Sequence, residues 1–301
     1  MRNRIHLALV AALAVGCSAK TLPTQSPIAV SPLQFQSGEV RVPDQVIVVT
    51  DSSGTMYDNE TFPLAKALTR TFVAAMPDGD TASRSSLGYE AGLVGFGGDE
   101  RIRAGLAPFD RGNLSSKASV LRPLGEVGGF GGRTPYHAVL AESQVELAGK
   151  SGVAALVIFS DGLPDDEMDA LRAAKALVES RNGNVCIHTV QTGDDPAGAS
   201  LLSRLSRLSS CGSHRSAASV GNPSAFGQFA HDVFAGKGPL LTDTIRQHAQ
   251  QAAPQARLVL SEFEPVIVAW LIAYEAGGGK VGDAVYKTLR DTMPPDLKRK
   301  E

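Results

Sequence analysis

The sequence lacks an excess of charge of one sign, and it lacks a hydrophobic run long enough to cross a membrane. Its 29 Lys and Arg residues nearly balance 31 Asp and Glu residues, for a formal net charge of -2. Because nucleic-acid binding requires a basic surface, this balance gives no indication of it. The apolar run at residues 5–15 is too short to span a bilayer as a helix. The remaining composition, 43% hydrophobic over 301 residues, is typical of one globular domain with flanking segments.

The signatures of several enzyme classes are also missing. No Gly-x-Ser-x-Gly motif occurs, which argues against an α/β serine hydrolase. The glycine-rich stretch 128–132 is not followed by the Lys-Ser/Thr pair of a phosphate-binding loop, and we interpret it as a plain loop. The histidines have no paired spacing that suits zinc, so we interpret them as scattered surface or core residues: His137, His188, His214, His231 and His248.

The N-terminus has the pattern of an export signal. Arg2 and Arg4 precede the apolar run, and the small residues 14–16 lead directly into Cys17 and the polar Ser18. This junction resembles the lipobox of bacterial lipoproteins, although Ala stands where Leu is more usual. The resemblance implies a signal peptide at 1–16 and a lipidated, palmitate-bearing Cys17 as the mature N-terminus. An ordinary signal peptide that happens to contain a cysteine is the alternative.

A chain with a lipidated Cys17 is expected to be exported and anchored by lipid to the cell envelope. Ser18, in place of Asp, resembles the pattern that sorts lipoproteins to the outer membrane, on its periplasmic or surface side. If the cell has no outer membrane, the anchor lies in the plasma membrane.

Only three cysteines occur in the sequence. If Cys17 carries lipid, Cys186 and Cys211 remain as an even pair in a compartment where disulfides persist, and we expect them to pair. Two buried thiols are the alternative. Whether the side chains lie within bridging distance depends on how the intervening helix packs on the sheet.

Strand-like and helix-like segments alternate over residues 44–236. This pattern predicts an α/β domain with a doubly wound, mostly parallel sheet and helices on both faces. Residues 17–43, rich in Pro, Ser, Thr and Gln, are expected to form a flexible tether, and 237–301 a helical C-terminal extension. Expected strands are 45–50, 91–96, 101–108, 154–160, 184–192 and 215–220, the second and third forming a hairpin at a sheet edge; expected helices are 61–76, 134–147, 167–179, 199–208 and 224–234.

Oxygen-bearing side chains follow two of the expected strands and open one of the expected helices. Asp51, Ser53 and Thr55 stand on alternate residues of a turn after the first strand, Asp161 follows a later buried strand, and Thr134 opens the central helix. Ligands of doubly wound sheets bind beyond the carboxyl ends of the strands. A sparse set of carboxylate and hydroxyl oxygens at such an edge suits a hard divalent cation.

Together these five residues resemble the metal-ion-dependent adhesion site (MIDAS) of von Willebrand factor A (vWA) domains. The only departure is Thr55, where serine is commoner. The resemblance implies a divalent cation, Mg²⁺ first with Mn²⁺ or Ca²⁺ as alternatives, held by hydroxyls directly and by the aspartates partly through water. One coordination position stays open for an Asp or Glu carboxylate of a partner protein. The function implied is protein binding, adhesion or scaffolding, rather than catalysis.

Other functions compete with this interpretation. Phosphotransferases of the haloacid dehalogenase class also place an aspartate after the first strand, but they need a second aspartate where Ser53 stands. A metal-dependent hydrolase would need a general base, and the nearest candidates, Asp58, Asp165 and Asp166, are expected to be solvated loop charges. A structural lipoprotein with a vestigial site is the third possibility.

Overall fold

The computed structural model describes residues 22–36, 39–78, 88–97, 103–124 and 134–237. The expected signal peptide, Cys17 and the extension beyond residue 237 lie outside these residues. Two compact units are present, and residues 22–34 and 42–234 belong to the first. The second contains a short antiparallel pair, β1 (Glu39–Arg41) with β8 (Ala235–Lys237). No helix within the described ranges is long and apolar enough to cross a membrane.

The first unit is built on a six-stranded sheet with the order β4-β3-β2-β5-β6-β7. Every neighbouring pair is parallel except β3 and β4, which form the expected antiparallel hairpin at one edge. The predicted fold class, a mostly parallel sheet, is therefore confirmed. The strands are β2 (Pro43–Asp51), β3 (Glu90–Phe96), β4 (Arg103–Pro108), β5 (Val153–Ser160), β6 (Val185–Gln191) and β7 (Ser213–Ser216).

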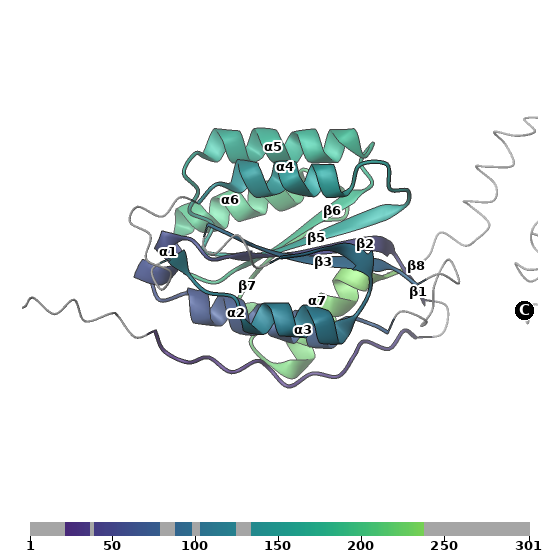
Figure 1. The fold of residues 1–301 in the computed structure, drawn as a ribbon, viewed down its shortest axis with the longest axis horizontal. Coiled ribbons are helices and arrows are strands. Elements are labelled where there is room, and N and C mark those ends of the chain that lie inside the picture. Colours follow the sequence, from purple (N-terminus) through teal and green to yellow (C-terminus); the bar gives the residue numbers. More distant parts are fainter. Residues whose placement is uncertain (1–21, 37–38, 79–87, 98–102, 125–133, 238–301) are drawn as a thin grey trace, which may run out of the picture. The chain divides into compact units, whose positions relative to one another are not determined.

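Helices cover both faces of the sheet. In Figure 1, α4, α5 and α6 lie on one face, and α2, α3 and α7 lie on the other. The short helices α1 and α3 were not expected from the sequence. The helices are α1 (Gly54–Asp58), α2 (Phe62–Ala75), α3 (Arg111–Ser119), α4 (Tyr136–Glu146), α5 (Glu167–Ser180), α6 (Pro196–Arg207) and α7 (Pro223–Phe234), with a 3-10 turn at Ala218–Val220.

The two central strands carry apolar side chains on both of their faces. Residues 46–49 of β2 and 154–159 of β5 are all buried, as a strand covered by helices on both sides requires. Aromatic rings from α2, α7 and β5 fill one layer, with Phe72 contacting Phe159, Phe229 and Phe234. The register pairs Val46 with Ala155 and Val49 with Ile158, and it sets the position of the residues that follow each strand.

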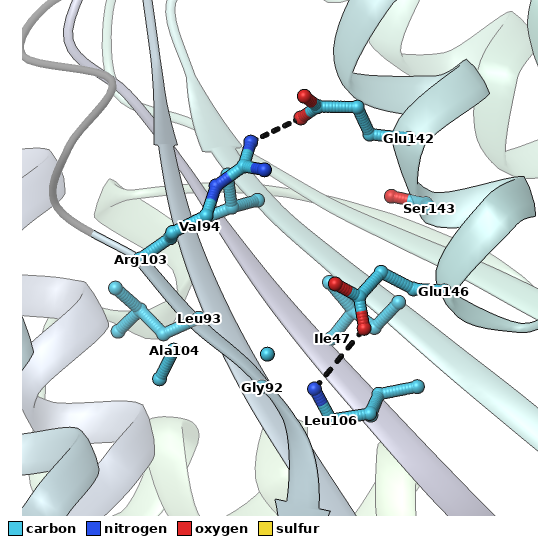
Figure 2. A pocket seen from close by; sticks show the side chains of 11 residues that line it. Ile47, Gly92, Leu93, Val94, Arg103, Ala104, Leu106, Glu142, Ser143 and Glu146 are labelled. Carbon is cyan, nitrogen blue, oxygen red and sulfur yellow. Dashed lines mark hydrogen bonds and ion pairs between the residues drawn. The ribbon is translucent and has the colours of Figure 1, made fainter.

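The edge hairpin is held to α4 by two acidic side chains (Figure 2). Glu142 pairs with Arg103 of β4, and Glu146 accepts a hydrogen bond of 3.2 Å from the backbone nitrogen of Leu106. The latter contact satisfies a donor at the point where the β3–β4 register shifts. The cavity between these elements measures about 30 Å³, which is room for little more than one water.

Residues 22–34 form an extended segment that lies along α2, and we call it the N-terminal strap. The backbone nitrogen of Ile28 donates to the Thr71 hydroxyl at 2.9 Å, and that of Leu33 donates to the Ala75 carbonyl at 2.9 Å. Ile28 and Leu33 are half-buried. The expected flexible tether at 17–43 is thus attached to the domain over these residues, because apolar side chains between the prolines find a partner surface on α2.

Cys186 of β6 and Cys211, which follows α6, form a disulfide with a Cα–Cα distance of 5.0 Å. Its presence confirms the expected pairing. The covalent link fastens the α6 connection to the sheet, where the Ser209 hydroxyl also accepts a hydrogen bond from the Ile187 nitrogen.

Removing this link is expected to destabilise the domain. A closed loop of 25 residues corresponds to about 3.5 kcal/mol of unfolding free energy in the chain-entropy model. The double substitution Cys186→Ala with Cys211→Ala should lower the unfolding free energy by that order, measured by urea denaturation. A reductant should weaken the native chain and leave the variant unchanged. Equal stability of the two oxidised proteins would contradict the expectation.

A second prediction concerns His188 of β6, whose ring is buried, with Nδ1 3.0 Å from the Ser213 hydroxyl. Burial lowers the pKa of His188 to about 4; Asp232 opposes this shift and Arg215 adds to it. The unfolded chain takes up this proton below about pH 6.5, whereas the folded chain does so only near 4. Stability should therefore fall, by about 3 kcal/mol, as pH drops from 6.5 to 4.

The matched variant is His188→Gln, which cannot titrate. Urea denaturation of both proteins at pH 7 and pH 4 should show a steeper loss for the native chain. Parallel losses in the two proteins would show that other groups cause the acid sensitivity.

Candidate metal centre

Four of the five predicted site residues lie at or just after the ends of the two central strands. Asp51 is the last residue of β2, and Asp161 comes directly after Ser160, the last residue of β5. These strands are parallel neighbours in register, so their carboxyl ends meet at one edge of the sheet. The chain leaves β2 through α2 on one face and leaves β5 through α5 on the other (Figure 1). The pair therefore stands at the switch point of the sheet, where doubly wound folds bind ligands.

Asp51 is fully buried and held by both carboxylate oxygens. Oδ1 accepts the Ser53 backbone nitrogen at 3.0 Å, and Oδ2 accepts the Ser160 hydroxyl at 2.5 Å. Ser160 Oγ in turn accepts hydrogen bonds from the Tyr136 hydroxyl and, at 2.9 Å, from the Gly162 nitrogen. Since each of these groups has its donor or acceptor role fixed, the orientation of the Asp51 carboxylate is fixed as well.

The two hydroxyl residues of the first motif lie side by side. Ser53 Oγ and Thr55 Oγ1 are 3.1 Å apart at the start of α1. Ser53 occupies the N-cap position of α1, yet its hydroxyl makes no capping hydrogen bond. Both hydroxyls therefore keep lone pairs for a further ligand.

Asp161 has one satisfied oxygen and one without a partner. Oδ1 accepts the Leu163 nitrogen at 3.1 Å, whereas Oδ2 is buried and has no hydrogen-bond partner. The Asp161 backbone nitrogen lies 3.3 Å from the sulfur of Met56, which also receives the Thr61 hydroxyl at 3.3 Å. A buried carboxylate oxygen without a partner is unfavourable, so Oδ2 would be stabilised by a hydrogen-bond donor or a cation.

Burial disfavours ionisation of both carboxyls, and the charge of Asp161 adds to this effect at Asp51. Burial, followed by the charge of Asp161, raises the pKa of Asp51 to about 7. Burial also raises the pKa of Asp161, whereas the Leu163 nitrogen and the nearby polar side chains of Thr55 and Asn59 oppose this shift. A cation near both groups would reverse these shifts, because it favours the ionised form of each.

Thr134 reaches the site edge by a different route. It is buried two residues before α4, and Pro135 rather than Thr134 occupies the N-cap position. Its nitrogen donates to Asp165 Oδ1 at 2.8 Å, and its carbonyl accepts the Asp165 nitrogen at 3.2 Å. Within the described residues no hydrogen bond joins Thr134 to the other four predicted ligands. The Asp165 contact nevertheless ties Thr134 to the loop that carries Asp161.

Several supporting residues were missed by sequence reasoning. Tyr136, Met56 and Asn59 carry no motif, because their roles depend on contacts across the sheet edge. Gly198 of α6 packs so closely that a Cβ there would lie 2.0 Å from the Asp161 carbonyl oxygen. The role of Gly198 could be predicted from the sequence only if α6 were already known to contact the Asp161-Gly162 turn.

The donor set suits a hard divalent cation. Two carboxylates and two hydroxyls supply oxygen ligands without saturating an octahedral shell. A cation would also give the unpartnered Oδ2 of Asp161 a partner. No group of three or more His, Cys, Asp or Glu side chains that could hold a metal ion occurs among the described residues, so the hydroxyl oxygens would be needed to complete the ligand set. The residues present therefore fit the ion that the sequence predicts.

No protein-family model matches the sequence, and no curated protein matches it. Similar solved structures include a von Willebrand factor type A protein from Catenulispora acidiphila, 17% identical over 69% of this chain and 47% of that chain, with a TM-score of 0.46. Proximal thread matrix protein 1 from the mussel byssus, with a zinc-occupied MIDAS motif, is 16% identical over 66% and 49% of the two chains, with a TM-score of 0.46.

A manganese-loaded TRAP protein of Plasmodium vivax is 19% identical over 55% of this chain and 64% of that chain, with a TM-score of 0.37. The match covers less than half the length of the first two chains and less than two thirds of the third. At these identities the similarity concerns the fold alone.

The contact between Gly198 and Asp161 gives a test of how the site is positioned. Gly198→Ala should push the Asp161 turn out of place, costing about 1–3 kcal/mol of stability and weakening divalent-cation binding. Gly227→Ala in α7 is the control, because a Cβ there meets nothing within 4 Å and should stabilise the helix by up to about 1 kcal/mol. Calorimetric titration and urea denaturation measure both effects. Unchanged affinity in Gly198→Ala would refute the positioning role.

Proposed function

We propose that the chain is a lipid-anchored protein-binding module of the cell envelope, which docks a partner's carboxylate on a divalent cation. The observation that carries the proposal is the buried, unpartnered Oδ2 of Asp161 beside the Asp51 carboxylate and the Ser53 and Thr55 hydroxyls. Two carboxylates balance the charge of Mg²⁺ without filling its coordination shell. The ion then stays electrophilic enough to accept an Asp or Glu side chain from outside.

The acidic residues near the site support docking rather than hydrolysis. Asp165 accepts the Thr134 nitrogen, and Asp166 caps α5 by accepting the Asp169 nitrogen at 2.8 Å. Both side chains are exposed, as expected of loop charges, and each carboxylate in addition accepts a backbone hydrogen bond. These structural hydrogen bonds account for both acidic residues without a role as general base.

Anchoring through Cys17 would place this module at the envelope. The supporting features are the charged and apolar N-terminus and the lipobox-like junction, with Ser18 favouring the outer membrane where the cell has one. The Cys186–Cys211 disulfide suits an exported protein. The partner is then a protein that presents an Asp or Glu side chain in the same compartment.

The first test is calorimetric titration of the oxidised mature chain with Mg²⁺, Mn²⁺ and Zn²⁺. Asp51→Ala and Asp161→Ala should each abolish saturable binding, because each removes a carboxylate from the site. Asp194→Ala is the matched control: this exposed carboxylate lies in the loop between β6 and α6 and contributes no ligand. Circular dichroism and thermal unfolding verify that each variant is folded.

A soluble carboxylate separates the competing functions. Acetate should increase the affinity of the native chain for the ion by completing its shell. A folded native chain that takes up no ion, with or without acetate, would favour the vestigial site and refute the proposal. Metal-dependent hydrolysis of ester or phosphoester model substrates, lost in Asp161→Ala, would instead favour the enzyme.

A further inference from the structure

A groove of about 420 Å³ lies between the strap, the start of α2 and the segment that follows α3. Leu22 and the next three residues of the strap form one wall, and Phe62 and Pro63 of α2 contribute apolar surface. Val120 stands at the other side with 51% of its surface exposed, which is unusual for a large apolar side chain in this domain. The groove is thus open to solvent and is lined by both apolar and polar side chains.

The charges that line the groove are all positive. Lys66 is fixed by a hydrogen bond of 3.0 Å from its ammonium to the Leu121 carbonyl oxygen. Arg70 and Arg122 are exposed, and neither makes an ion pair within the part of the chain that the structure describes. None of the described residues lining the groove is acidic. Cationic and apolar side chains in one groove are the combination that binds an anionic membrane interface.

The strap fixes which end of the domain lies near the predicted lipid anchor. It runs in the same direction as α2: its start lies beside Phe62, while Ile28 and Leu33 contact residues 71 and 75. In Figure 1 the strap passes below α2 and α3, starting from the end of the domain that carries α1. Leu22 lies five positions after Cys17 in the sequence, a length of chain that spans at most about 18 Å.

We propose that this groove binds the phosphate headgroups of anionic lipids, and that it turns the metal-site end of the domain toward the membrane that holds Cys17. The orientation rests on the lipid anchor of the proposed function, whereas headgroup binding by the groove does not. The partner's carboxylate then belongs to a protein held in that same membrane. A diffusible partner would have to enter the space between the domain and the lipid surface.

Vesicle sedimentation of residues 18–301, oxidised and without lipid, tests the groove. This chain contains every described element. EDTA is added to remove divalent ions, so the result does not depend on whether the metal site binds an ion. Vesicles of phosphatidylcholine with one-third phosphatidylglycerol should bind the chain, and vesicles of phosphatidylcholine alone should not. Arg70→Gln with Arg122→Gln should weaken partition about 25-fold, since each cation near an anionic surface contributes about fivefold.

The matched control is Arg172→Gln with Lys175→Gln, which removes the same charge from the exposed face of α5. This double variant should bind anionic vesicles as the native chain does. Equal loss in both double variants would show unspecific attraction by net charge and overturn the proposal. Equal binding to neutral and anionic vesicles, or binding to neither, would overturn it as well.

Depth-dependent quenching tests the orientation in the full lipidated chain. A fluorophore on Ser119→Cys, at the end of α3 near the groove, should be quenched by brominated lipids, whereas one on Glu179→Cys at the far end of α5 should not. The reverse pattern, or equal quenching, would overturn the orientation. Absence of lipid on the native chain would remove the anchor of the proposed function and leave the vesicle result standing.

Discussion

Burial of the Asp51 carboxylate at the end of a central strand is the constraint on which the rest of the site depends. A carboxylate at such a position loses its hydration, and a second one, Asp161, follows the neighbouring strand. The fold offsets part of this cost with hydroxyl and backbone donors, through Ser160, Tyr136 and Ser53. It leaves one oxygen of Asp161 without a donor. The sheet therefore holds two acidic groups in place for a positive charge that the protein itself does not provide.

The described groups that contact the Asp51 and Asp161 carboxylates carry no positive charge. Among the described residues no Lys or Arg donates a hydrogen bond to either carboxylate, and the donors are the Ser160 hydroxyl and the backbone nitrogens of Ser53 and Leu163. Met56 fills the space beneath with a thioether, which accepts weakly from Asp161 and Thr61 and brings no charge. An arginine there would satisfy Asp161 and remove the demand for a cation. The uncharged neighbours thus hold the two carboxylates in place and leave their negative charges unneutralised.

Sequence patterns predicted the central strands and the residues at their carboxyl edge, whereas the last strand, expected at 215–220, is Ser213–Ser216 followed by a 3-10 turn. Continuous apolar runs identified β2 and β5, and the rule that ligands bind beyond parallel strands then brought Asp51 and Asp161 together. Sequence patterns did not predict roles that depend on contacts between segments far apart in the sequence. The strap was expected to be flexible because its composition is that of a linker, whereas its attachment depends on hydrogen bonds to Thr71 and Ala75 of α2. Gly198 likewise acquires a role only because Asp161 meets it across the edge.

The polarity of the fold explains why the strap begins at the metal edge. In a parallel doubly wound sheet each helix starts beyond the carboxyl end of the preceding strand, so α2 begins beside the turn that carries Ser53 and Thr55. A segment that lies along α2 in the same direction must therefore have its upstream end at that edge. Had the strap run antiparallel to α2, the same contacts would place the N-terminus at the opposite end of the sheet. The direction of one extended segment thus decides which end of the domain stays close to the predicted anchor and which end remains open to solvent.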